Sequence, residues 1–150
     1  MEEKRTARKY ELVKTDCKKI HRNGVEHTLY RVRYLVNIKG RCERGELGGY
    51  IESEDNLSHE GMCVVLGRAM AYGESMVRGN AIIRDHCEIS ENVLIDDNAI
   101  IHNDVVIRDN CVVACDANIF GNITLINDIY VKGNVILKGS AVLSGEMDIM

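Results

Sequence analysis

The histidines are the residues whose chemistry most directly suggests a catalytic or metal site. An imidazole can serve as a general base or as a metal ligand near neutral pH. A catalytic zinc takes three protein ligands and a water, but His86 and His102 lie sixteen residues apart with no third ligand at a suitable spacing. The sequence therefore predicts no metal site, no catalytic residue and no cofactor.

A glycine-rich stretch and the cysteines could also mark a functional site, but neither has the spacing of a known binding motif. The glycine-rich stretch "GELGG", residues 45–49, lacks the Lys-Ser or Lys-Thr ending of a phosphate-binding loop. The six cysteines contain no CxxC pair. We expect them to be small apolar residues in a reducing compartment, with disulfides or metal ligation as the alternatives.

Basic residues gather near the N-terminus. Residues 1–44 contain 13 Lys/Arg and 6 Asp/Glu, and the remaining residues are acidic enough to give a net charge of −4. This asymmetry indicates either two differently solvated pieces or a basic segment that contacts an anion or an acidic partner. The second interpretation yields a candidate ligand-binding set: Arg31, Arg33, Arg41, Arg44, Tyr50, Glu52 and His59. The acidic total and the few interleaved aromatic residues, Tyr30 and Tyr34, argue against nucleic acid as the partner.

A six-residue repeat dominates the rest of the chain. Residues 61–150 divide without an insertion into fifteen units such as "GNAIIR" and "DNAIIH". The first position is usually Gly, Asp or Asn, the third is small or apolar, and the fifth is always apolar. This period excludes a helix. It predicts a solenoid of parallel strands in which each unit forms one short side and three units close a coil of about 18 residues.

Weaker units extend the repeat backwards. "GYIESE" and "DNLSHE" fit the same spacing, which predicts a solenoid over residues 49–150 with about five and a half coils. His59 then takes an inward position, as a residue that caps the core or, alternatively, as a ligand contact.

Residues 1–48 are predicted to form a separate basic hairpin. "RKYELVKTD" and "EHTLYRVRYLVNI" have the composition of strands, and Asn23-Gly24 between them is a strong turn signal. A stack of coils needs its open end covered, because unpaired strand edges recruit other chains. We therefore expect the hairpin to cap the solenoid.

The repeat over residues 61–150 resembles the hexapeptide-repeat, left-handed parallel β-helix family. The left hand and a parallel homotrimer are what this resemblance implies. A narrower resemblance comes from "LGGYIESEDNLS", Leu47–Ser58, which is similar to a group of phage and prophage proteins often labelled as transferases. It implies an accessory or anti-defence role in a host cell.

Many proteins of this family are acyltransferases that use acetyl-CoA or a similar donor. Such enzymes need a catalytic histidine, a loop that leaves the coil and a C-terminal element, and this sequence departs from that pattern on each count. We therefore expect a non-catalytic binding or scaffold protein for a host protein or a small anionic ligand such as a nucleotide. Acyl transfer, with a base from His59 or a neighbouring subunit, is the alternative.

The outward fourth positions of the repeat predict an oligomer. Two of the three faces carry apolar rows, and monomers seldom expose such patches; strand propensity alone is the alternative explanation. The expected interface residues are Val64, Leu66, Met76, Ile82, Leu94, Ile100, Val112, Phe120, Tyr130 and Ile136.

The sequence also predicts where the protein works. No apolar run approaches the ~18 residues of a membrane span, and the first residues lack the apolar centre of a signal peptide. We expect a cytoplasmic protein without a membrane partner, in the host cytoplasm if a phage encodes it.

Overall fold

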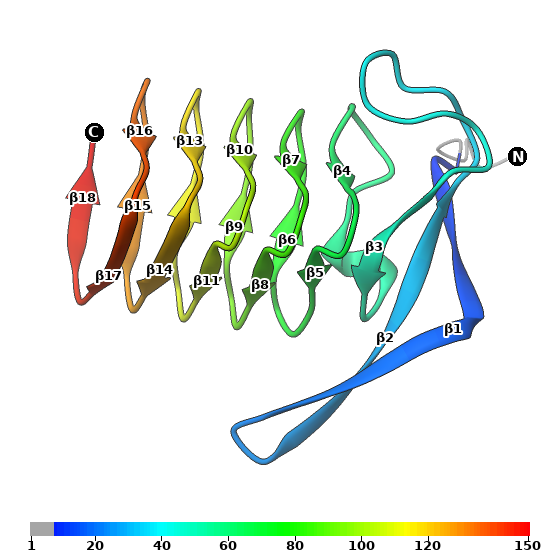
Figure 1. Ribbon diagram of the computed structural model, residues 1–150, viewed down its shortest axis with the longest axis horizontal. Helices are drawn as coiled ribbons and strands as arrows, with labels where there is room; N and C mark the ends of the chain where they lie inside the picture. The colour runs from blue at the N-terminus through cyan, green and yellow to red at the C-terminus, as the bar shows by residue number, and fades with distance from the viewer. Residues whose placement is uncertain (1–7) are drawn as a thin grey trace, which may run out of the picture.

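The computed structural model describes residues 8–150, which form an all-β parallel solenoid of about six turns with a β-hairpin at one end (Figure 1). The predicted solenoid is therefore confirmed. The expectation of a cytoplasmic protein rested partly on the first residues of the chain. Of these, residues 1–7 lie outside the described residues. Between residues 8 and 150 no helix has the length and hydropathy that a membrane crossing needs.

Three sheets make the three sides of the solenoid, and we name them A, B and C. In spatial order, sheet A contains β1 (Tyr10–Arg22), β2 (Val25–Tyr34), β3 (Leu47–Ile51), β5 (Met70–Ala71), β8 (Glu88–Ser90), β11 (Val106–Arg108), β14 (Asn122–Ile126) and β17 (Ser140–Ser144). Sheet B contains β16 (Ile136–Leu137), β13 (Asn118–Ile119), β10 (Ile100–Ile101), β7 (Ile82–Ile83) and β4 (Val64–Val65). Sheet C contains β18 (Met147–Ile149), β15 (Ile129–Val131), β12 (Val112–Val113), β9 (Leu94–Ile95) and β6 (Met76–Val77).

The repeat positions take the roles that the sequence predicts for them. Third and fifth positions fill the interior, and Ala81, Ile83, Cys87 and Ile89 are fully buried examples. First positions turn the corner, and non-glycine residues there, such as Asp85 with φ 63°, have left-handed backbone angles. Because Asp and Asn tolerate this conformation better than other L-residues, they alternate with Gly at the corners.

Hydrogen bonds between coils fix the register at one coil of 18 residues. Ile100 pairs with Ile82 on one side and with Asn118 on the other. Each backbone amide therefore bonds to the coil before or after its own, and side chains at equivalent repeat positions stack along each face.

Corner side chains add a second ladder. The Asn103 N–H donates to Asp85 Oδ2 at 2.9 Å, and the Gly121 N–H donates to Asn103 Oδ1 at 3.1 Å. These bonds satisfy amide groups that the turns leave without a strand partner.

The first coil departs from the repeat, and the predicted backward register is wrong by two residues. Ile51 pairs with Ala71, and Leu57 pairs with Val77, each 20 residues along the chain instead of 18. The two extra residues lie between Leu57 and Cys63, just after the 3₁₀ turn η1 (Glu54–Asn56). His59 consequently does not take the inward position that the sequence predicted.

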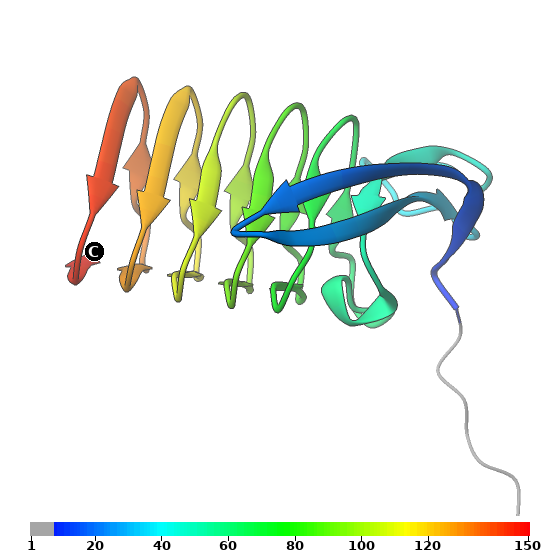
Figure 2. The ribbon, with the colours of Figure 1, turned by 90° about the horizontal axis from the view of Figure 1, so that it is seen from below.

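The hairpin continues sheet A. β1 pairs antiparallel with β2, and β2 pairs antiparallel with β3, which starts the parallel ladder. Both turn residues have positive φ, 52° at Asn23 and 76° at Gly24, as a tight hairpin turn requires. The hairpin then runs back along the outer side of sheet A (Figure 2).

Corner glycines differ in how closely the next coil approaches, which gives a matched test of the fold. A Cβ on Gly61 (φ +73°) would lie 2.4 Å from the Gly79 carbonyl oxygen, whereas a Cβ on Gly133 (φ +77°) meets nothing within 4 Å. Both alanine variants pay the left-handed penalty of about 1–2 kcal/mol. Gly61→Ala should lose roughly 1–3 kcal/mol more because a backbone atom must move. Urea denaturation measures the difference, and equal losses would contradict the coil spacing.

Candidate functional site

The structure divides the predicted ligand-binding set among separate places. Arg31 and Tyr50 lie together, whereas Glu52 contacts His27 and His59 contacts Glu54. Arg33 binds Glu11 on the hairpin surface. Arg41 donates to the carbonyl oxygens of Met62 and Asn80, and Arg44 is exposed on the same loop.

Arg31 and Tyr50 anchor a cationic surface on the hairpin. The Arg31 guanidinium donates to Tyr50 Oη at 3.0 Å and lies 4.6 Å from that ring's centroid. Lys18 Nζ lies 4.4 Å from the same ring, and Lys14 Nζ lies 4.1 Å from the Tyr30 ring. We call these five residues the basic hairpin face.

One carboxylate already occupies the centre of this face. Asp16 accepts a hydrogen bond from Tyr50 Oη at 2.9 Å and lies 3.5 Å from Arg31 Nε. Asp16 belongs to an irregularity in β1, where the pairing with β2 jumps between Val13 and Cys17. The bulge therefore aims an acidic side chain between the cations, and the face binds a carboxylate in the form of its own Asp16.

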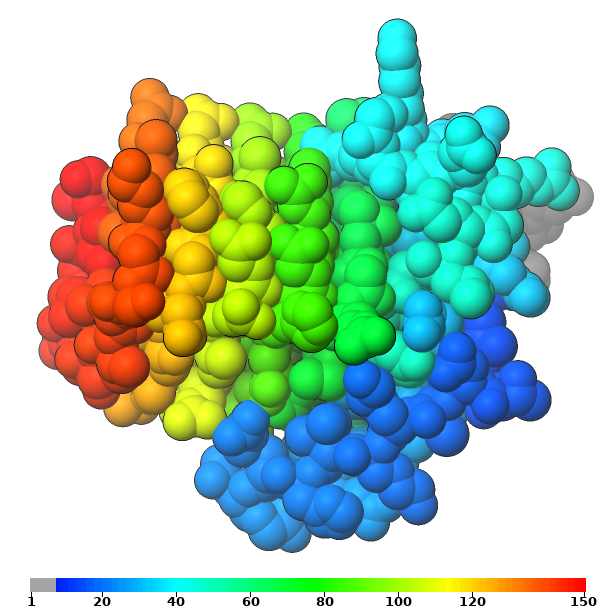
Figure 3. All heavy atoms as spheres, viewed as in Figure 1, coloured from blue at the N-terminus to red at the C-terminus, as the bar shows by residue number. Residues whose placement is uncertain are grey.

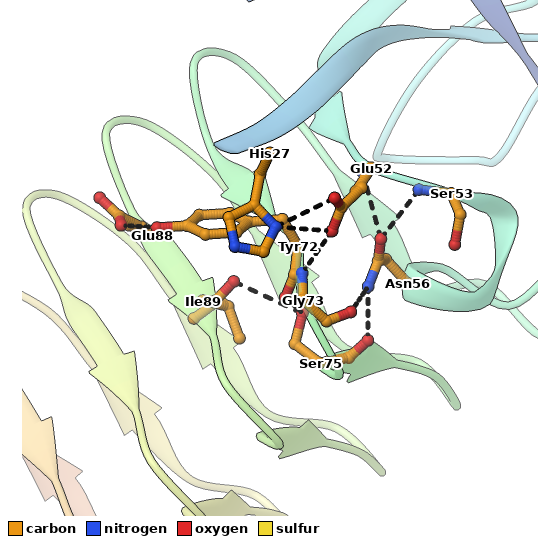
Figure 4. Close-up of polar contacts among 9 residues, drawn as sticks. All are labelled: His27, Glu52, Ser53, Asn56, Tyr72, Gly73, Ser75, Glu88 and Ile89. Carbon is orange, nitrogen blue, oxygen red and sulfur yellow. Dashed lines mark hydrogen bonds and ion pairs between the residues drawn. The ribbon is translucent and has the colours of Figure 1, made fainter. Parts of the chain in front are cut away.

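A polar cluster that the sequence analysis missed holds the hairpin tip against the solenoid; Figure 4 draws its members other than Arg22. The Arg22 guanidinium lies 2.5 Å from a Glu88 carboxylate oxygen, and Tyr72 donates its hydroxyl hydrogen to the same oxygen. Burial, followed by the Glu88 contact, raises the pKa of Tyr72, so its hydroxyl stays a donor. The available signal was Glu88 itself, an acidic residue in an outward row otherwise apolar at Met70 and Val106.

His27 and Glu52 form the second half of this cluster. His27 Nδ1 lies 3.0 Å from both carboxylate oxygens of Glu52, and the Gly73 N–H donates to Glu52 at 2.8 Å. Asn56 fixes the segment that carries Glu52, since its amide donates to Ser75 O at 2.8 Å and its Oδ1 accepts the Glu52 N–H. Figure 4 shows His27 lying over the Tyr72 ring, with centroids 5.0 Å apart.

His59 lies at the opposite edge of the first coil with both ring nitrogens engaged. Nδ1 accepts the Lys9 N–H at 3.1 Å, so the proton resides on Nε2, which lies 2.6 Å from Glu54. The ring stacks on Tyr10 with a 4.1 Å centroid separation. The hydrogen bond from His59 lowers the pKa of Glu54. His59 is therefore a structural contact in this arrangement and offers no free nitrogen to act as a base.

Metal ligation finds no support in this part of the molecule. Across residues 8–150, no group of three or more His, Cys, Asp and Glu side chains is arranged to hold a metal ion. The cysteines in this range are all free, and burial raises the pKa of Cys87 to about 12, so that thiol is a poor metal ligand.

The outer rows of sheets B and C remain open to partners. Ile82 and Ile100 on sheet B and Leu94 and Val112 on sheet C are partly exposed, and Tyr130 is 38% exposed. An open groove of about 500 Å³ runs along sheet C beside these residues. The remaining predicted interface residues Leu66, Met76, Phe120 and Ile136 are also at least partly exposed.

Val64 is the exception among the predicted interface residues. It is fully buried, and it belongs to the same core cluster as Ile38 and Cys42 from the loop that precedes β3. Sequence reasoning placed Val64 on an open face because nothing in the repeat pattern indicates that this loop folds over β4.

Glu88 provides a direct test of how the hairpin is held. Glu88→Gln keeps the shape of the side chain but removes the charge that Arg22 and Tyr72 bind. A hydrogen bond to a charged group contributes about 1.5–3 kcal/mol, so amide exchange at the hairpin tip should accelerate at least tenfold by mass spectrometry. Glu26→Gln, which affects only the exposed pairs with Lys19 and His21, is the control, and equal protection in both variants would refute the anchor.

Comparison with known proteins finds no family model that matches the chain and no matching curated protein. The function therefore has to be argued from the solenoid faces and the basic hairpin face.

Proposed function

We propose that the chain forms a homotrimer of left-handed parallel β-helices and acts as a non-catalytic binding protein. In this arrangement sheets B and C face the other subunits, and the basic hairpin face takes a small anionic ligand such as a nucleotide. The likeness of Leu47–Ser58 to phage and prophage proteins supports an accessory or anti-defence role in the host cytoplasm.

This proposal rests on a difference between the three outer faces of the solenoid: the hairpin covers part of sheet A, whereas sheets B and C are exposed. The hairpin already occupies sheet A near its start, where Leu29, Tyr50 and Tyr72 form a small buried cluster. Sheets B and C instead expose rows of Ile, Leu, Val and Tyr side chains. Burial of such rows contributes about 25 cal/mol for each Å² removed from water, and a three-fold axis beside the corner between sheets B and C covers both rows.

The hairpin has a second role in this proposal, as the cap of the N-terminal end. Tyr10, Val32 and Tyr34 are fully buried and share a core cluster with Ile51 and Val65 of the first coils. Tyr34 Oη both donates to the Val65 carbonyl oxygen and accepts the Val65 N–H, which satisfies backbone groups at the start of sheet B.

Charge on the trimer faces tests the assembly. Ile82→Glu with Ile100→Glu places two carboxylates in the sheet B row, so the trimer should dissociate to monomers in sedimentation analysis because the charges cannot be buried unpaired. Thr124→Glu, on the outer row of sheet A, is the control and should leave the assembly unchanged. A double variant that still sediments as a trimer would refute the placement of sheet B at the interface.

The charge of the basic hairpin face supports an anionic ligand. The face carries three cationic side chains, Lys14, Lys18 and Arg31, and one carboxylate, Asp16. The Tyr50 hydroxyl and the Arg31 guanidinium both contact that carboxylate. Phosphate and carboxylate oxygens accept hydrogen bonds from the same donors. A ligand anion therefore takes the place of Asp16 between these cations.

Substitutions in this face should change anion affinity in opposite directions. With ATP as the probe in isothermal titration calorimetry, Lys14→Ala with Lys18→Ala should weaken binding at least tenfold, since each charge-assisted contact contributes about 1.5–3 kcal/mol. Asp16→Asn should strengthen binding because it removes the competing carboxylate. Lys132→Ala, a lysine beside the Tyr130 ring on the solenoid, is the control.

Native mass spectrometry of freshly purified protein separates the competing functions. A retained nucleotide supports the anionic-ligand proposal, and a retained host protein supports the scaffold version. A retained acyl-CoA would instead favour acyl transfer. The observation that favours this second function is the His27–Glu52 pair, in which a carboxylate orients an imidazole through Nδ1 as in catalytic dyads.

A further inference from the structure

A lysine side chain lies buried against a cysteine at the hairpin end of the solenoid core. Lys9 is 4% exposed, and Cys63 is fully buried. Lys9 Nζ lies 2.6 Å from the Cys63 carbonyl oxygen and 3.2 Å from Cys63 Sγ. Lys9 immediately precedes β1 and Cys63 immediately precedes β4, so this contact joins the hairpin segment to the first regular coil.

The backbone on both sides holds the two side chains together. The Lys9 N–H donates to His59 Nδ1 at 3.1 Å, and the Lys9 carbonyl oxygen accepts the Leu35 N–H at 2.8 Å. The Cys63 N–H donates to the Gly79 carbonyl oxygen at 3.0 Å, in register with the next coil. Because β4 is the terminal strand of sheet B, the Cys63 carbonyl oxygen has no neighbouring strand of that sheet and accepts its hydrogen bond from the lysine.

Lys9 has no carboxylate partner in the described part of the chain. The ion pairs formed within residues 8–150 do not include it. Burial lowers the pKa of Lys9, because removal from water penalises the ammonium form. Since a buried charge without a counter-ion is costly, the favourable states are a neutral amine beside a thiol and an ammonium beside a thiolate. Nitrogen and sulfur thus compete for one proton.

These two states supply the two halves of a reaction that cysteine undergoes on oxidation. A thiolate reacts with a peroxide to give a sulfenic acid, which condenses with a nitrogen nucleophile to give a sulfenamide. The neutral amine of Lys9 is such a nucleophile. The other hydrogen-bond neighbours of Cys63 Sγ are carbonyl oxygens, the nearest being that of Ser58 at 3.5 Å. A carbonyl oxygen is too weak a nucleophile to displace hydroxide from sulfur, so Lys9 is the group placed to react.

A cavity of about 350 Å³ lies beside the pair. Lys9 lines it together with His59, Ile38 and Met62. Met62, the chain neighbour of Cys63, is 45% exposed. Hydrogen peroxide is uncharged and little larger than water, so it can enter such a cavity without the desolvation cost of a charged oxidant.

We propose that hydrogen peroxide converts this contact into a covalent Lys9–Cys63 sulfenamide. The thiolate first attacks one peroxide oxygen: the S–O bond forms, the O–O bond breaks, and the departing hydroxide takes a proton from the Lys9 ammonium and leaves as water. The resulting amine then attacks the sulfur: the S–N bond forms, the S–O bond breaks, and the second hydroxide takes a proton from the nitrogen. Two electrons pass from the sulfur to one peroxide, which ends as two water molecules.

The cross-link closes a loop over residues 9–63, which contains the hairpin and the first coil. A covalent bond across a loop restricts the unfolded chain, so oxidation fastens the hairpin cap to the solenoid. Two equivalents of a thiol reverse the bond, giving the free amine, the free Cys63 thiol and a disulfide of the reductant. The site depends neither on the proposed trimer nor on the anionic ligand.

Mass spectrometry of the full chain after treatment with excess hydrogen peroxide tests the site. Cys17 and Cys115 are not buried, so both are changed to serine in the background used. The intact mass should fall by about 2 Da, the two hydrogen atoms lost on condensation. A peptide map without reductant should contain a species that joins the Lys9 and Cys63 peptides, and dithiothreitol should abolish it. The melting temperature of the oxidised protein should exceed that of the reduced protein by several degrees.

Cys87 is the internal control in the same map. It is as fully buried as Cys63, but its Sγ contacts the Asn103 carbonyl oxygen at 3.6 Å in place of an amine. Cys87 should therefore remain a free thiol.

Variants separate the cross-link from other oxidations. Lys9→Arg keeps a cation beside Cys63 without an amine nucleophile, so oxidation should stop at a sulfenic acid that dimedone traps. Lys9→Met should form no cross-link either, and it covers the case in which the guanidinium does not fit. Cys42→Ser should still form the cross-link, because Cys42, a member of the same buried cluster, takes no part in it.

The map of the otherwise unchanged chain decides the proposal without any lysine variant. A Cys42–Cys63 disulfide, an oxidised Cys63 without a bond to Lys9, or a Cys63 that stays a thiol would each overturn it.

Discussion

The rest of the structure depends on one constraint: every peptide group on the three sides must bond to the coil before or after its own. This requirement fixes the coil at 18 residues through most of the chain, as the pairing of Ile82, Ile100 and Asn118 shows. It also forces a turn every six residues, which Gly, Asn and Asp make at low cost. Interior side chains are then selected for small and similar sizes, because each stacks directly on its counterpart one coil away.

The first coil shows how a repeat of this kind is joined to something different. Its 20-residue spacing lets β3 serve both as the last antiparallel partner of the hairpin and as the first parallel strand of sheet A. The polar contacts of Glu52, Asn56 and Glu88 gather at this junction, where the hairpin folds back over sheet A. Figure 3 shows the hairpin as a ridge that stands out from the prism, which leaves the basic hairpin face accessible.

Sequence alone predicted the solenoid because the repeat encodes its geometry locally. Corner residues and inward positions can be assigned by counting, and Ala81, Ile83 and Asp85 lie where the count places them. Counting failed at His59, because two additional residues after Leu57 shift the register without disturbing the turn chemistry.

The polar contacts of the hairpin were harder to predict for a physical reason. His27 and Glu52, or Arg22 and Glu88, meet because the hairpin curls back over sheet A. The β1–β2 pairing also contains a register shift between Val13 and Cys17, a kind of irregularity that bends a strand. Neither the bulge nor the burial of Val64 by a distant loop has a periodic signature. Predicting the candidate site therefore required the tertiary path of the N-terminal segment, whereas predicting the coils did not.

The lengthened first coil has a consequence for folding. A stack of interchangeable coils can pair correctly in every local respect and still be displaced by one whole coil, since each neighbour looks like the next. Within residues 8–150 the 20-residue step at Ile51 and Leu57 occurs once, so a displaced stack would leave the hairpin facing a ladder of the wrong length. The irregular first coil thus defines the register of the whole stack, because the hairpin fits only beside this coil.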